Sequence, residues 1–432
     1  MSDPTSPSPS LMVKVPPEIW LRVFELTMTV PGELNRNACT IFERPGNPEV
    51  AIARADLVPT NLALLRTCRT FYSLAIEFLY RAILLRRQNA IERLLDTLQK
   101  SHAKVPVPGY TPKLGFRTRR LDVRIKAASQ WKRKGETVVK LLPFFPNLVY
   151  LLGCGNWGQI TSNLLIQPLS TLKHLQLLFV PIFEPETSYL ELSRLIVSTL
   201  PNLGAIVFSL NRRSKLEPML PNSFDNLRMM GTADSGLYHD SCQQPKALPS
   251  LRALHICSQE KINLDETFLL AHGAKITTID MEWCPLDQLV LTAPWFPNLR
   301  QIIIDLSYST FPKLKGLSGD IRGIESVKEV GLTIISRQLP ISMYNTAFPI
   351  LRKVFPQMVS LRFLEKRVVD LLMKQSLHKV KRWHEVMGEH KIHVEREDGE
   401  CILAELHVPC SIDSNGVRDL TQAMRDLRVS HV

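Results

Sequence analysis

The chain has 432 residues, of which 45% are apolar and 22% are charged. These values are ordinary for folded domains, so the composition excludes a largely disordered chain. With 53 Lys and Arg against 41 Asp and Glu, the formal charge is +12, which raises nucleic acid or another anionic surface as a partner to consider.

The sequence gives no sign of secretion or of membrane insertion. The first ten residues are rich in Ser and Pro, and no stretch approaches the length of apolar sequence that a bilayer requires. The eight cysteines are too sparse for a disulfide-stapled fold, and none forms a C-x-x-C pair. We therefore expect a cytoplasmic and/or nuclear protein with no membrane partner.

Helical patterns dominate the N-terminal residues, after an expected disordered tail at 1–13. Ile19, Val23 and Leu26 recur at the spacing of one helix face, and Pro17 suits a first turn. Residues 31–60 carry four prolines and predict a long loop with a short helix near 50–55. A second helix is predicted from Asn61, a first strand over 81–85, and a further helix after it.

From about residue 118 a phrase returns: Leu or Phe, Pro, any residue, Leu, followed by a short apolar strand. Phe145–Leu148 and Phe296–Leu299 are clear copies, and looser copies begin at Leu169, Phe224, Gly273 and Ile324. Successive copies lie 23 to 31 residues apart, which is typical of leucine-rich repeats. The fourth positions are Leu148, Leu172, Leu203, Leu227, Leu251, Ile276, Leu299, Val327 and Met358.

This pattern predicts an α/β fold of parallel strands alternating with helices. One strand-plus-helix unit cannot bury its own apolar face, whereas stacked units share a continuous core. We assign residues 118–365 to a leucine-rich-repeat-like solenoid and 101–117 to a linker. Residues 366–432 are expected to form an α+β cap, with a helix over 364–383, a hairpin around Asp398-Gly399 and a closing helix over 417–427.

Two short segments near the N-terminus carry a family likeness. Residues 15–24, Val-Pro-Pro-Glu-Ile-Trp-Leu-Arg-Val-Phe, resemble the opening helix of an F-box, which usually begins Leu-Pro-x-Glu-Ile. Residues 62–71 resemble its second half, with Cys68-Arg69 in place, and Leu79-Tyr80 resembles its end. Val15 and Thr67 depart from the usual Leu and Val, and about 30 extra residues lie between the halves. The whole resembles the F-box proteins with degenerate leucine-rich repeats of mushroom-forming (basidiomycete) fungi.

The resemblance implies an F-box-like helical module over residues 14–100, with an insert at about 31–60. It also implies a substrate adaptor of an SCF-type ubiquitin ligase, in which the module binds a Skp-family linker and, through it, a cullin scaffold. The repeats would hold an unknown protein substrate, and catalysis would take place on other subunits. The expected linker-facing residues are Pro16, Ile19, Val23, Phe24, Leu62, Leu65 and Cys68.

The excess positive charge is concentrated in residues 113–140, which hold 10 basic and 2 acidic side chains, whereas residues 141–432 hold 30 and 29. This segment is either a candidate anion-binding patch or a solvated edge that covers the open end of the solenoid. With few aromatic residues interleaved, nucleic acid is not the expected partner. The candidate patch comprises Arg117, Arg119, Arg120, Arg124, Lys132, Arg133 and Lys134.

The remaining motifs favour no enzyme. Residues 153–158 match G-x-G-x-x-G, but the segment lacks the following helix and acidic residue of a dinucleotide site. His384 and His390 are six residues apart, so they do not share a helix face as zinc ligands do. We therefore expect no catalytic residues, no cofactor and no metal. The alternative to a ligase adaptor is a repeat-based scaffold whose N-terminal helices merely cap the solenoid.

Overall fold

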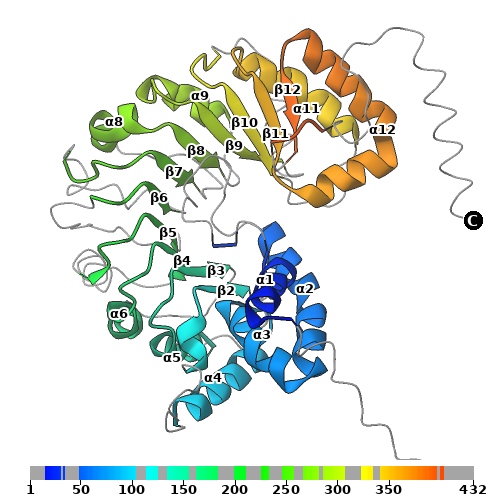
Figure 1. The fold of residues 1–432 in the computed structure, drawn as a ribbon. Coiled ribbons are helices and arrows are strands. Elements are labelled where there is room, and N and C mark those ends of the chain that lie inside the picture. Colours follow the sequence, from blue (N-terminus) through cyan, green and yellow to red (C-terminus); the bar gives the residue numbers. More distant parts are fainter. Residues whose placement is uncertain are drawn as a thin grey trace, which may run out of the picture.

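One continuous sheet of parallel strands runs through the chain, and each strand pairs with the next one in sequence (Figure 1). The structure is a computed structural model that describes residues 15–30, 33–34, 48–103, 113–124, 134–154, 162–182, 199–210, 225–232, 246–256, 266–281, 286–306, 323–333, 341–396 and 399–402. In these residues the sheet has 12 strands. They are β1 (Ala82–Leu85), β2 (Arg120–Arg124), β3 (Tyr150–Cys154), β4 (Leu177–Ile182), β5 (Ala205–Leu210), β6 (Met229–Thr232), β7 (Ala253–Ile256), β8 (Thr278–Met281), β9 (Gln301–Asp305), β10 (Glu329–Thr333), β11 (Ser360–Phe363) and β12 (His393–Glu395).

Helices alternate with the strands and cover the outer side of the curved sheet (Figure 1). The α/β class and the stack of parallel strands predicted from the repeats are therefore confirmed. The helices between strands are α4 (Gln88–Ala103), α5 (Lys134–Leu141), α6 (Ser162–Ser170), α8 (Glu266–His272), α9 (Leu286–Thr292) and α11 (Ile341–Val354), with short 3₁₀ turns at Leu114–Arg117, Leu142–Phe144, Gly273–Lys275 and Ala293–Trp295.

The core of the sheet is a row of apolar side chains, one from each of the strands β2 to β12. Successive residues of a strand face opposite sides of a sheet, so parallel strands in register place one row inside and the adjacent row outside. The inner row is completely buried or nearly so, and a single large hydrophobic cluster contains it. Its members are Leu121, Leu151, Leu178, Ile206, Met230, Leu254, Ile279, Ile302, Val330, Leu361 and Val394.

In the described residues, the recurring sequence phrase forms the same turn before β2 to β5 and before β7 to β11. The N–H of its fourth residue donates to the carbonyl of its first, over 3.0 to 3.4 Å. Where the third residue is Asn, its Nδ2 donates to the carbonyl of the second residue in the preceding turn, as Asn298 does to Ala274 at 2.7 Å. The donors of the turn bond are Thr118, Leu148, Leu175, Leu203, Leu251, Ile276, Leu299, Val327 and Met358.

Two assignments of the phrase need correction. The copy predicted from Leu169 to Leu172 is aligned three residues too early, because Gln176 pairs with Val149 and Leu175 therefore occupies the fourth position. A further copy, Gly115 to Thr118, was missed because it has neither the proline nor the leucines. Its buried Thr118 takes the place of the fourth leucine.

The N-terminal helices are α1 (Pro17–Met28), α2 (Pro48–Thr67) and α3 (Arg69–Arg81). The predicted loop over 31–60 is wrong for its second half, because α2 begins at Pro48 and continues through Pro59. Proline removes one hydrogen bond from a helix, but packing on both sides can maintain the helix. Arg54 before Pro59 and Leu65 after it are both buried.

The ends of the sheet lie outside the range predicted for the solenoid. β1 directly follows α3 and pairs with β2, and β12 pairs with β11 after the long helix α12 (Lys366–Glu389). An antiparallel bridge from Glu395 to Cys401, with Gly399 at φ 88°, matches the predicted hairpin. The predicted helix over 417–427 lies outside the described residues.

Where the turns of neighbouring repeats lie in close contact, some positions have room only for glycine. A Cβ added to Gly273 would lie 2.2 Å from the carbonyl oxygen of Trp295 in the next turn. We expect Gly273→Ala to lower the free energy of unfolding by about 1–3 kcal/mol, because backbone must move to admit the methyl group. Gly388 in α12 has no atom near its added Cβ, so Gly388→Ala should leave stability unchanged or raise it by up to about 1 kcal/mol. Thermal melting of the two variants tests this, and an equal loss in both would contradict it.

Candidate functional site

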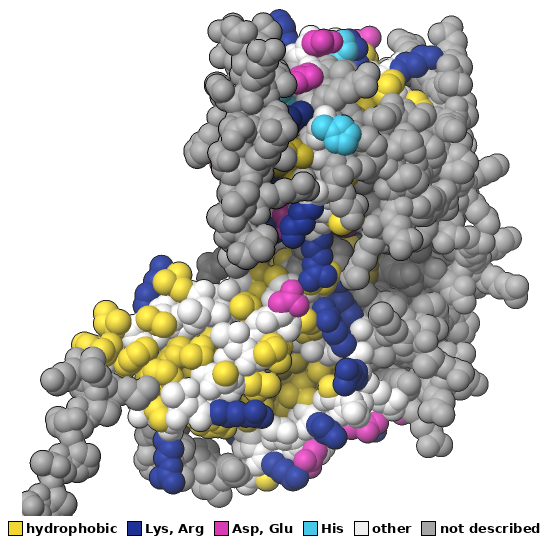
Figure 2. All heavy atoms as spheres, turned by 90° about the vertical axis from the view of Figure 1, so that its right-hand side faces the viewer, with side chains coloured by type: hydrophobic (Ala, Val, Ile, Leu, Met, Phe, Trp, Pro, Cys, Tyr) yellow, Lys and Arg dark blue, Asp and Glu magenta, His cyan; other side chains and the backbone are white. Residues whose placement is uncertain are grey.

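An apolar stripe on α1 faces away from the other residues that the structure describes. Ile19, Val23 and Leu26 lie one helical turn apart, and their side chains are 54%, 38% and 68% exposed. Figure 2 shows apolar side chains gathered on this helical module. Exposed apolar side chains on one face of a helix are typical of a surface that another protein covers. Tyr72 on α3 and Val58 on α2 add further exposed apolar area to the module.

The opposite face of α1 holds the module together. Phe24 and Met28 are buried with Phe71, Ala75 and other residues of α3. The rings of Phe24 and Phe71 meet edge to face at 5.0 Å, and Trp20 lies 4.7 Å from Phe71. This packing leaves the Ile19 face of the helix unused.

The structure divides the predicted linker-facing residues into two groups. Pro16, Ile19 and Val23 are exposed, as a docking face requires. Phe24 and Leu65 were placed wrongly on that face, because both are buried in the core of the module. The side chains of Leu62 and Cys68 are half-buried and pack against this core. Cys68 also caps α3, where its Sγ accepts a hydrogen bond from the N–H of Phe71 at 3.4 Å. Leu26 was part of the predicted apolar stripe but was not expected to face the linker.

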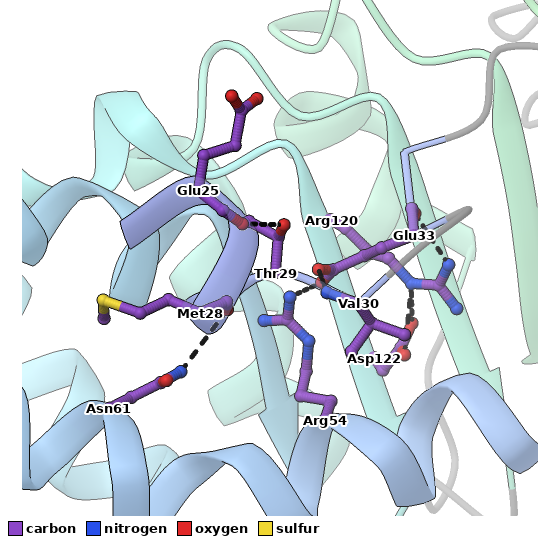
Figure 3. A network of polar contacts seen from close by, with 9 residues as sticks. All are labelled: Glu25, Met28, Thr29, Val30, Glu33, Arg54, Asn61, Arg120 and Asp122. Carbon is purple, nitrogen blue, oxygen red and sulfur yellow. Dashed lines mark hydrogen bonds and ion pairs between the residues drawn. The ribbon is translucent and has the colours of Figure 1, made fainter. Parts of the chain in front are cut away.

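A buried group of charges joins this module to the first repeat (Figure 3). Arg120 and Asp122 lie on the outward row of β2, and the Nε of Arg120 donates to both carboxylate oxygens of Asp122 at 3.0 and 3.2 Å. An Nη1 hydrogen bond of 2.9 Å joins Arg120 to the carbonyl of Glu33. The Glu33 side chain in turn pairs with Arg54 of α2.

These four charged residues compensate one another in a dry environment. All four are buried, and two cations face two carboxylates. Burial lowers the pKa of Arg54 to about 9, and the negative charge of Asp122 opposes that shift. With a pKa of about 9 the guanidinium is charged at neutral pH, where it pairs with Glu33. The group thus fixes the module rigidly against the start of the sheet.

The charge group explains a wrong prediction about the basic segment. Arg120 was expected in an exposed anion-binding patch, but its charge is neutralised inside the protein by Asp122. Arg117 is partly exposed and pairs with Glu77 of α3 at 2.8 Å. Arg119 is exposed, and Arg124 is half-buried. Lys132 and Arg133 lie outside the described residues, as does the side chain of Lys134, so the structure does not test this part of the patch.

A cleft of about 830 Å³ lies where the module meets the first repeats. Its wall includes Arg81 and Glu77 of α3, and its floor is formed by residues that precede β2 to β5. Arg119 and His174 bring further basic groups to it. Arg81 was not predicted to take part, because it is 38 residues distant from Arg119 in sequence and comes close only when β1 pairs with β2.

Comparisons with known proteins found no relative: no protein-family model matches the sequence, and no curated protein matches it. Within the described residues, no helix is long and apolar enough to cross a membrane.

The charge group makes a prediction about stability. Asp122→Asn removes one carboxylate and leaves Arg120 and Arg54 facing each other with a single counter-charge. We expect the free energy of unfolding to fall by about 3–5 kcal/mol, as for other broken buried ion pairs. Urea unfolding followed by circular dichroism measures this. Asp96 forms an exposed pair with Lys100, so the matched Asp96→Asn should cost less than about 1 kcal/mol. Equal effects in the two variants would show that the buried group does not join the module to the sheet.

Proposed function

We propose that the protein is a substrate-recognition adaptor of an SCF-type ubiquitin ligase. The helical module would bind a Skp-family linker protein, and the repeat sheet would hold a protein substrate. The observation that carries the proposal is the exposed stripe of Ile19, Val23 and Leu26 on α1. It lies on the segment that resembles the opening helix of an F-box, and nothing in the described chain covers it.

An adaptor must make two binding contacts on one rigid body, so that a substrate is held at a fixed orientation to a separate catalytic subunit. The buried charges between α2, the turn after α1 and β2 supply that rigidity. Covering a large apolar side chain completely contributes about 1.5–3 kcal/mol, so a stripe of three can carry much of a docking interaction.

This role requires no catalytic residue in the chain. Catalysis would belong to partner subunits assembled on a cullin scaffold, in the cytoplasm and/or the nucleus. The second candidate function is a protein-interaction scaffold without a ligase. It has the same fold, but it predicts that the stripe on α1 binds no Skp-family linker. The exposure of Ile19 and Val23 favours the adaptor, because helices that merely cap a solenoid would bury them.

The proposal predicts that a Skp-family linker copurifies with the full chain. Ile19→Asp combined with Val23→Asp should abolish copurification, because two carboxylates would be desolvated at the contact. Both side chains are exposed, so the fold should be retained, which circular dichroism checks. The matched control is Leu270→Asp with Leu291→Asp, two exposed leucines on α8 and α9 outside the module. Two outcomes would favour the scaffold. In one, the linker binds both double variants equally well; in the other, it binds neither the unchanged protein nor either variant.

A further inference from the structure

The residue immediately before each of the strands β1 to β11 occupies an equivalent place in its repeat. Its N–H donates to the carbonyl of the equivalent residue one strand earlier, over 2.7 to 2.9 Å, from Arg119 and Arg81 through to Val359 and Lys328. This backbone ladder fixes the residues in one line along the edge where the strands begin. We name them the pre-strand row: Arg81, Arg119, Val149, Gln176, Gly204, Arg228, Arg252, Thr277, Arg300, Lys328 and Val359.

The pre-strand row is strongly basic. It holds Arg or Lys at six of its 11 positions and contains no Asp or Glu. Arg119, Arg228, Arg252, Arg300 and Lys328 are exposed. Among the ion pairs of the described residues, none involves these five. Exposed carboxylates do occur nearby, at Asp225 and Glu325, but earlier in their turns.

Folding therefore gathers basic side chains on one surface, although the overall charge of these residues is close to zero. Residues 141–432 carry almost equal numbers of basic and acidic side chains, yet four of their cations fall in the row. Figure 2 shows Lys and Arg side chains following one another in a column that begins beside the helical module. A line of uncompensated cations favours a ligand with a line of negative charges.

The row ends in the cleft at the module. Arg81, Arg119, Val149 and Gln176 of the row all line it, together with Leu34 and Phe116. Apolar side chains and an amide stand here beside the basic groups. A ligand that fills this cleft would combine acidic groups with an apolar side chain, which a peptide does and a simple polyphosphate does not.

We infer that the pre-strand row and this cleft bind an extended acidic segment of a partner protein. The row carries no aromatic residue; of the aromatic rings that line the cleft, Tyr150 is buried and Phe116 packs edge to face against His102. Binding of single-stranded nucleic acid relies instead on a series of exposed stacking platforms. Eight strand-to-strand steps separate Arg119 from Lys328. At about 4.8 Å a step they span about 38 Å, the length of roughly 12 extended residues. As the substrate surface of a ligase the row rests on the proposed function, but the binding itself does not.

The test uses the full chain and a fluorescent peptide of alternating Glu and Ala, about 12 residues long to match the row. Binding is followed by fluorescence anisotropy at increasing salt. The row variant combines Arg228→Gln, Arg252→Gln and Arg300→Gln. We expect it to weaken binding about tenfold, since each exposed pair contributes a factor of about two to three. Salt should weaken the binding of the unchanged protein more than that of the row variant.

The matched control combines Arg93→Gln, Lys140→Gln and Lys366→Gln, three exposed cations on α4, α5 and α12 that change the net charge equally. This control should bind the peptide almost as the unchanged protein does. Equal weakening by both triple variants overturns the inference, because net charge alone would then explain binding. Equally tight binding of a Gln-Ala peptide also overturns it. Tighter binding of a single-stranded oligothymidylate of the same length overturns it in favour of nucleic acid.

Failure here is distinguishable from failure of the ligase proposal. The Ile19→Asp, Val23→Asp variant should keep peptide binding, and the row variant should keep linker copurification. If the row variant no longer copurified with the linker, the apolar stripe on α1 and the pre-strand row would not be independent binding surfaces. An unchanged protein that copurifies with the linker but does not bind the peptide overturns the acidic-segment inference alone.

Discussion

The architecture depends on a single constraint, which is that every strand must start at the same edge and in the same register. The turns before β2 to β5 and before β7 to β11 meet this constraint with a hydrogen bond from the fourth residue to the first. Asparagine at the third position bonds to the turn before it, as Asn226 does to Pro201 at 2.8 Å. Once the starts of the strands are aligned, the alternation of side chains puts one apolar row into the core. The same alignment puts the pre-strand row on the surface. The core and the basic edge are thus two consequences of one repeated turn.

The module depends on a different kind of interaction. Its helices are joined to one another by aromatic packing around Phe71, but they are joined to the sheet by buried charges. Ion pairs of this kind rarely add stability over apolar packing, because desolvation offsets the attraction. Their geometry is more demanding, since Arg120 must reach both Asp122 and the carbonyl of Glu33. We infer that the group specifies one orientation of α1 relative to the sheet, so the apolar stripe on α1 and the basic row keep a fixed relation.

Features that depend on local sequence patterns could be predicted from the sequence. The repeat phrase predicted the parallel strands because a proline and a leucine recur at fixed spacing before each short apolar segment. The helical spacing of Ile19, Val23 and Leu26 predicted a stripe, but it could not tell which side is covered. Phe24 is buried because α3 lies against it, and Arg120 is buried because α2 and the turn after α1 close over β2. Both facts depend on contacts between distant segments. The α2 helix was predicted as two separate pieces, a short helix near 50–55 and a helix from Asn61, because Pro59 signals a break that tertiary packing overrides.

The pre-strand row also could not be predicted by counting charges along the sequence. Summed by segment, the repeats are almost neutral, and the charge excess belongs to residues 113–140. In the fold, part of that excess is neutralised in the buried group, while Arg228, Arg252, Arg300 and Lys328 gather on one edge. Uncharged residues fill the same position elsewhere in the row, since Val149, Gln176, Gly204 and Thr277 make the same backbone bonds. Arg252 has a structural role as well, because its Nη1 donates to the carbonyl of Leu251 in its own turn at 2.7 Å. The backbone ladder does not depend on the charges of Arg228, Arg300 and Lys328, and these exposed charges support the proposed binding of an acidic segment.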